Sequence, residues 1–274
     1  MVSTLSLVFM LCSALIVFLF PSGLLIYLYR SEKISLKAAG VGALVFVVFQ
    51  FLIRIPLLAS LSVHPQFQQM KENLFFSAVL IGGLSAGLFE EVGRYLGFRF
   101  LLNKKLSWKN GVAYGLGHGG IEAIGLVGLT YIGNIVLSLM INTGTFDQLV
   151  GTQLDPAAAT MFKNQLVNTP SYYFLIGGLE RFFSFVIQIG LSLVVLYGVV
   201  NRKLRYLLYA ILLHALVNAP AVIMTQLGVN IWLVELYILF LAILAFAWIM
   251  RARSLFAPSP SGAAAGIHSE EENR

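Results

Sequence analysis

The sequence is poor in charged residues and in cysteine. Asp, Glu, Lys and Arg together make up 11% of its 274 residues, whereas an ordinary soluble domain carries about 25%. This depletion argues against a soluble globular domain. The one cysteine, Cys12, excludes an intramolecular disulfide, and its position inside an apolar run favours a lipid-facing packing role over a reactive thiol.

A face of concentrated positive charge is also missing. The formal net charge is +6, but the basic residues stand at the ends of apolar runs, as membrane topology requires, and they form no basic face. We therefore exclude nucleic acid as a partner. The same distribution makes membrane lipids the expected surroundings of the chain.

What the sequence has in abundance is long apolar runs. Hydrophobic residues make up 58% of the chain, and several runs exceed the roughly 20 residues that a helix needs to cross a bilayer. The fourth run is too long for one perpendicular crossing, so it is expected to tilt or to continue outside the bilayer. The pattern predicts an all-α, polytopic transmembrane helical bundle, a single domain over residues 1–257, with about seven spans: 5–29, 38–62, 74–102, 110–140, 172–200, 206–226 and 229–250.

Basic residues in alternate loops predict the orientation of this bundle. The intervening loops contain only two Lys or Arg residues, Lys71 and Lys163. The positive-inside rule therefore places the amino terminus outside and the carboxyl terminus in the cytoplasm. Residues 1–20 lack a basic n-region, and we interpret them as part of a retained first span rather than a signal peptide. The basic loop residues are Arg30, Lys33, Lys37, Lys104, Lys105, Lys109, Arg202, Lys203, Arg205, Arg251 and Arg253.

Two segments fall outside the predicted bundle. Residues 141–170 form a polar external loop rich in Asn, Thr, Gln and Asp, a composition and length that suit a lid or a re-entrant piece. Residues 258–274 are rich in Pro, Ser, Gly, Ala and Glu. This composition predicts a disordered cytoplasmic tail.

Ionisable residues inside the predicted spans carry the functional signal. Each costs about 2.5–3.5 kcal/mol at helix-centre depth, so each needs a reason. Residues four apart share a helix face, and three spans present such a polar pair at similar depth. Scattered polar residues would rarely do this, which favours a functional site. The pairs are Glu90 with Arg94, His118 with Glu122, and His214 with Asn218.

Further polar residues of the spans support this set. Glu91 adjoins Glu90, and Gln188 of the fifth span falls near the same depth. Glu180 and Arg181 lie closer to the outer face. Because they are adjacent on one helix, they should point in different directions and need other partners. We interpret Gln188, Glu180 and Arg181 as structural supports of the site.

One mechanism that fits these residue types needs no metal. Two neighbouring carboxylates in a poorly solvated site cannot both ionise easily. Glu90 or Glu91 can therefore act as general base for a water and afterwards return the proton. His118 would hold the same water, while His214 and Asn218 would donate to the developing oxyanion.

The alternative is a metal-dependent mechanism. Glu90, His118 and His214 would bind a divalent metal such as zinc, which acidifies a bound water. The spacing of His118 and Glu122 is not that of the HExxH zinc-protease signature. The residues themselves therefore leave the choice between metal and no metal open.

The polar pairs resemble the motifs of a known clan of intramembrane proteases. The CAAX-protease and bacteriocin-processing clan carries EExxxR, FxxxH and HxxxN or HxxxD. Within this clan, the segments GRYLGFRF and GLGHGGIEA are similar to the YhfC family of bacterial membrane proteins. The resemblance covers most of spans three to six, and the matching residues are Glu90-Glu91-x-x-Arg94, Tyr114-x-x-x-His118 and His214-x-x-x-Asn218.

This resemblance implies a division of roles and a location. Glu90 and His118 would activate the water, and His214 and Asn218 would stabilise the oxyanion. The protein would be integral to a bacterial plasma membrane.

The chain departs from the family pattern at three positions. Arg94 stands one residue short of the EExxxR spacing, and Tyr114 replaces the Phe of FxxxH. A His often follows the Glu-Arg motif of the fifth span in this family, where this chain has Gln188. A metal site that used this position would be weakened.

We hypothesise an intramembrane endopeptidase, of glutamic or metallo type, that hydrolyses a peptide bond of a membrane-embedded or lipidated substrate. Two alternatives stay open. Glu122, Glu180 and Arg181 extend the polar track outward, as in a proton-coupled transporter or channel. A non-catalytic immunity or binding protein would also keep such a scaffold.

Overall fold

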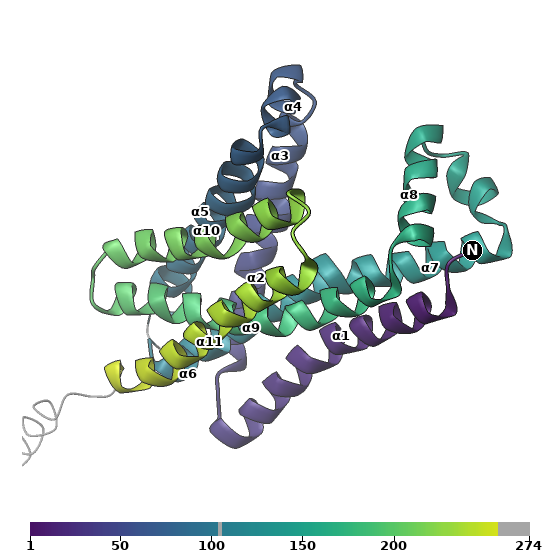
Figure 1. Cartoon of the computed structure of the whole chain (residues 1–274). Helices are drawn as coiled ribbons and strands as arrows, with labels where there is room; N and C mark the ends of the chain where they lie inside the picture. The colour runs from purple at the N-terminus through teal and green to yellow at the C-terminus, as the bar shows by residue number, and fades with distance from the viewer. Residues whose placement is uncertain (104–105, 257–274) are drawn as a thin grey trace, which may run out of the picture.

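The regular structure of the described chain is entirely helical. The computed structural model describes residues 1–103 and 106–256, and every regular element within them is a helix (Figure 1). The all-α prediction is confirmed. The predicted loop residues Lys104 and Lys105 and the predicted tail at 258–274 lie outside the described residues.

Seven helical runs in the described residues are long and apolar enough to cross a membrane, as predicted. Each lies within a few residues of the range expected from the sequence. Here η marks a π-helical segment. The runs are α1 (Thr4–Glu32); α2, η1 and α3 (Leu36–Phe46, Val47–Arg54, Ile55–Leu61); η2, α5 and η3 (Phe76–Ser85, Ala86–Leu96, Gly97–Leu101); α6, η4 and α7 (Trp108–Glu122, Ala123–Gly128, Leu129–Thr143); α9 (Ser171–Val200); α10 (Arg205–Gln226); and α11 (Ile231–Leu255).

Three of the seven spans contain π-helical turns. Such turns are rare and often lie at functional sites. The segment η2 ends at Ser85, one turn before Glu90, and η4 begins directly after Glu122. The polar residues of the third and fourth spans therefore stand close to irregular turns.

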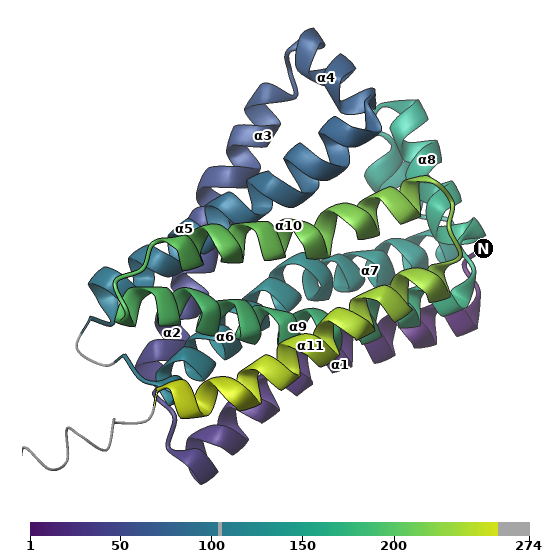
Figure 2. The ribbon, with the colours of Figure 1, turned by 60° about the vertical axis from the view of Figure 1, so that its left-hand side comes forward.

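Helix α9 forms the centre of the bundle. In its most apolar stretch 72% of the residues are buried, whereas the other spans bury 22–39% of theirs. It contacts α1, α6, α10 and α11, and Figure 2 shows α10 and α11 lying along it. Polar side chains on α9 therefore meet protein rather than lipid.

Two glycines let α6 approach its neighbours closely. A Cβ at Gly115 would lie 2.6 Å from the Cα of Ile189 on α9, and one at Gly117 would overlap the backbone of Ala39 on α2. Small residues at helix contacts allow such close packing in membranes. These contacts hold His118, which lies between α2 and α9, fully buried.

A proline in α10 is compensated by a neighbouring helix. Pro220 has no N–H, so the carbonyl of Leu216, four residues earlier, loses its helical donor. The hydroxyl of Tyr237 on α11 donates to this carbonyl. In hydrocarbon a freed carbonyl needs such a partner.

The predicted polar loop at 141–170 is largely helical. It contains η5 (Asp147–Gly151) and α8 (Pro156–Asn168), with Asp155 capping α8 and Lys163 paired to Asp147 at 2.9 Å. The loop lies at the same end of the bundle as the amino terminus, where Asn142 bonds the backbone of Val2 (Figure 1). The side of the membrane on which this end lies stays a prediction.

We expect Gly115→Ala to destabilise the protein by about 1–3 kcal/mol, because the added methyl group must push α6 away from α9. Gly133 on α7, in the same span, is the matched control, since a Cβ there meets nothing within 4 Å. Gly133→Ala should be neutral or stabilising. The midpoint of thermal unfolding in detergent measures both, and an equal response of the two variants would contradict the packing described here.

Candidate active site

The predicted polar residues surround one pocket in the middle of the bundle. This polar pocket has a volume of about 290 Å³ and is lined by residues from six of the seven spans. Glu91, Arg94 and His118 lie behind its wall with no exposed surface. The polar lining residues are Gln50, Arg54, Glu90, Glu122, Glu180, Arg181, Ser184, Gln188, His214 and Asn218.

Glu90 and His118 form a direct polar contact between the third and fourth spans. His118 Nε2 lies 3.0 Å from Glu90 Oε2, and Glu90 is 4% exposed. His118 Nδ1 has no hydrogen-bond partner among the described residues. The motif residues of two different spans thus meet at a carboxylate oxygen that also borders the pocket.

Glu91 orients His214 on the opposite wall. His214 Nδ1 lies 2.7 Å from Glu91 Oε1. An ionised carboxylate accepts only, so Nδ1 carries a proton in that state. His214 Nε2 then faces Glu90, 4.0 Å from its Oε1. A carboxylate that fixes the tautomer of a histidine in this way is typical of metal and catalytic sites.

Arg94 and Gln188 connect the two carboxylates to the fifth span. The Arg94 guanidinium donates to Glu91 Oε1 and to Gln188 Oε1, and its Nη2 lies 3.8 Å from Glu90 Oε2. Because Arg94 only donates, the amide nitrogen of Gln188 must point the other way. It donates to Glu122 Oε2 and, at 3.4 Å, to Glu90 Oε2.

Glu180 and Arg181 correct one prediction. They were expected to point apart and to need other partners, but Arg181 Nη2 donates to Glu180 Oε1. A long guanidinium side chain can bend back to its neighbour, so adjacency on a helix did not separate them. Arg181 also has the expected second partner, because its Nη1 lies 3.7 Å from Glu122 Oε1.

The second span contributes a polar pair that was not predicted. Gln50 and Arg54 line the pocket, and Arg54 donates to Gln50 Oε1, Ser85 Oγ and the carbonyl of Ile81. The sequence did contain the spacing that marks such a pair, since Gln50 and Arg54 are also four residues apart within a span. Arg54 ties the second span to the third just ahead of the two carboxylates.

Asn218 reaches the pocket from α10. Its Nδ2 donates to the carbonyl of Gly82 in η2 at 3.2 Å. This bond joins α10 to the third span, one helical turn away from His214. Its predicted part in holding an oxyanion remains a proposal.

The donor set fits a divalent metal ion. Glu90, His118 and Glu122 each offer a ligand atom within 4.8 Å of the others, and two carboxylates with an imidazole are ligands that zinc accepts. Glu90 and His118 were predicted as ligands, whereas Glu122 stands here in place of His214.

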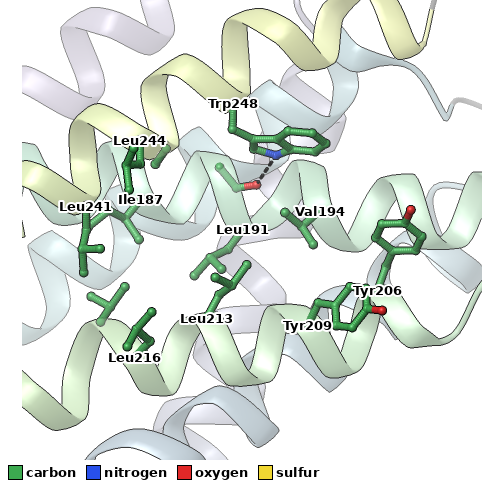
Figure 3. A pocket seen from close by; sticks show the side chains of 13 residues that line it. Ile187, Leu191, Val194, Tyr206, Tyr209, Leu213, Leu216, Leu241, Leu244 and Trp248 are labelled. Atoms are coloured by element: carbon green, nitrogen blue, oxygen red, sulfur yellow. Dashed lines mark hydrogen bonds between the residues drawn. The ribbon is translucent and has the colours of Figure 1, made fainter.

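An apolar groove adjoins the polar pocket. It has a volume of about 400 Å³ and lies between α9, α10 and α11, with Leu, Ile, Val and aromatic side chains converging on it (Figure 3). The two cavities share Ile187, Leu191 and Val217 as wall residues. The two cavities are therefore neighbours within the bundle.

Comparisons with known proteins agree with the motifs. A model of the YhfC intramembrane metalloprotease family matches residues 16–238, a range that includes residues of all six spans lining the pocket. Over 260 residues the chain is 42% identical to "Uncharacterized membrane protein YhfC" of Bacillus subtilis (strain 168), covering 93% of this chain and all of the relative. No solved structure matches the chain.

We expect Gln188→Met to lower the free energy of unfolding, because Arg94 loses an acceptor and Glu122 a donor. Each buried charged group left without its partner costs at least about 1–3 kcal/mol. Gln226→Met, at the exposed end of α10, is the matched control and should change little. Thermal unfolding in detergent compares the two, and an unchanged midpoint for Gln188→Met would show that the amide does not connect the carboxylates.

Proposed function

The chain belongs to the YhfC intramembrane metalloprotease family, and from this membership and the geometry of the polar pocket we propose that it is a metal-dependent intramembrane endopeptidase. The observation that carries the proposal is the 3.0 Å contact of Glu90 with His118 beside a pocket inside the bundle. The family match and the apolar helices also confirm the prediction of an integral bacterial membrane protein.

Glu90, His118 and Glu122 would hold the metal, with zinc as the ion that suits two carboxylates and an imidazole. When bound, such an ion polarises the substrate carbonyl and acidifies a water. The amide of Gln188 contacts both carboxylates. It therefore restrains the two acidic ligands from the side of α9.

Proton transfer falls to Glu90 and His214. Glu90 Oε2 faces His118, and its Oε1 faces His214 Nε2 across 4.0 Å. In this proposal the Glu90 oxygen that would not hold the metal takes a proton from the attacking water and returns it to the leaving amine. His214, held between Glu91 and Glu90, carries a second proton on Nε2 and donates it toward the developing oxyanion, with Asn218 on the same wall.

The substrate class follows from the neighbouring groove. A peptide bond at the carboxylates would be flanked by a segment that lies against the apolar side chains of Leu191, Leu213 and Leu216 (Figure 3). Such a segment is apolar, since burying unpaired polar groups there is costly. This supports cleavage of a membrane-embedded or lipidated peptide.

A proton-coupled transporter is the second candidate. The observation that favours it is the row of ion pairs from Glu122 through Arg181 to Glu180, which runs along the wall of the pocket. Ionisable rows inside membranes often mark transport paths. Proteoliposomes would then show a proton flux that Glu122→Gln abolishes, and a lack of flux would leave hydrolysis as the function.

We expect Glu90→Gln to lower the rate of peptide cleavage by about 100-fold or more, because the general base is lost. Purified protein is incubated with a library of transmembrane peptides and lipopeptides, and the products are identified by mass. Glu72→Gln on α4 (Pro65–Glu72), an exposed position, should retain full activity. Equal cleavage by wild type and Glu90→Gln would overturn the proposal.

We expect one divalent metal ion per chain, and we expect His118→Ala and Glu122→Gln each to reduce the bound amount at least tenfold. Elemental analysis of the purified protein measures this without an activity assay. His64→Ala, at an exposed histidine before α4, should keep its metal. Metal-free wild-type protein that still cleaves peptides would favour the glutamic mechanism.

A further inference from the structure

A second polar cavity lies beneath α8, on the amino-terminal side of the polar pocket. It has a volume of about 470 Å³ and is bounded by α7, α8 and α9. We call it the α8 vestibule. Its uncharged polar lining residues are Thr130, Tyr131, Asn134, Gln165, Thr169 and Tyr173.

The α8 vestibule and the polar pocket share a wall. Leu126, Glu180 and Arg181 line both cavities. Arg181 therefore stands at the partition, bonded to Glu180 on one side and 3.7 Å from Glu122 on the other. Its Nε is buried and has no partner among the described residues, so the partition contains an unused donor.

The lining of the α8 vestibule suits water. Hydroxyl and amide groups project from three helices, whereas the groove between α9, α10 and α11 offers almost none. Apolar cavities stay dry, and polar ones of sufficient size hold water. A polar cavity of this size is large enough to hold several waters.

The α8 vestibule also reaches the surface of the protein. Gln165 is exposed and lines both the vestibule and a shallow depression on α8, next to Thr160 and Asn164. Tyr173, at the start of α9, is 40% exposed. The cavity thus extends from this surface inward as far as Arg181.

We propose that the α8 vestibule is the route by which water reaches the carboxylates, with Arg181 as the group that water must pass. Hydrolysis consumes one water for each bond cleaved, and the surrounding hydrocarbon supplies none. The role of this water, as a reactant, rests on the proposed hydrolytic function. The route itself is testable without a substrate.

Thiol accessibility tests this route. The chain has one cysteine, so Cys12→Ala gives a background in which single cysteines are read cleanly. Asn134→Cys lies in the vestibule, and Val136→Cys, two residues along α7 and 45% exposed on the outer face of the bundle, is the matched control. The probe is a charged, membrane-impermeant methanethiosulfonate reagent, applied from either side of sealed vesicles.

We expect Asn134→Cys to react at least tenfold faster than Val136→Cys, and only from the side on which α8 lies. Equal rates, or no reaction at Asn134→Cys, would overturn the proposal. A second position tests Arg181. Ser184→Cys lines the polar pocket beyond the partition, and its reaction should accelerate at least tenfold when Arg181→Gln is added, while Asn134→Cys keeps its rate.

The rate of peptide cleavage is a second, independent test of the water route. Blocking Asn134→Cys with a bulky reagent should lower kcat with KM unchanged, because water supply is slowed and substrate binding is not. Accessible cysteines in a protein that cleaves no peptide would leave the route intact and refute the proposed function alone. Cleavage at full rate with the vestibule blocked would refute the route alone.

Discussion

The buried guanidinium of Arg94 is the interaction on which the site depends. It is fully buried, and it bonds Glu91 and Gln188 while lying 3.8 Å from Glu90. A cation at this depth is tolerated only when it is paired. Through Glu91 it sets the direction of His214, and through the Gln188 amide it reaches Glu122. Four spans are thus held in register around one charge.

The sequence predicted the spans well and the site in part, for physical reasons. The thickness of the bilayer sets the minimum length of an apolar helix that crosses it, so the seven spans could be predicted from the lengths of the apolar runs. The i, i+4 spacing revealed which faces were polar, but not how far a long side chain would bend. That is why Arg181 was separated from Glu180. Glu122 was predicted on the same helix face as His118, but the spacing alone did not identify it as a metal ligand. Gln50 and Arg54 obeyed the same spacing rule and were overlooked.

The polar pocket lies between two very different cavities. The groove along α9, α10 and α11 presents carbon, and the α8 vestibule presents hydroxyls and amides. Hydrolysis within a membrane needs an apolar reactant and water at the same atoms. Under the proposed hydrolytic function, the groove would receive the apolar reactant and the α8 vestibule would supply the water.

Pro220 determines how α10 and α11 are joined beside the groove. Because it frees the carbonyl of Leu216, the Tyr237 hydroxyl forms the one side-chain hydrogen bond between α10 and α11 in the described part of the chain. A single net hydrogen bond is worth about 0.5–1.5 kcal/mol, close to thermal energy. Apolar packing of Val217, Ala221 and Met224 against Val234 and Ile238 joins the two helices over the rest of their contact, so the proline fixes where the single polar contact between them is made.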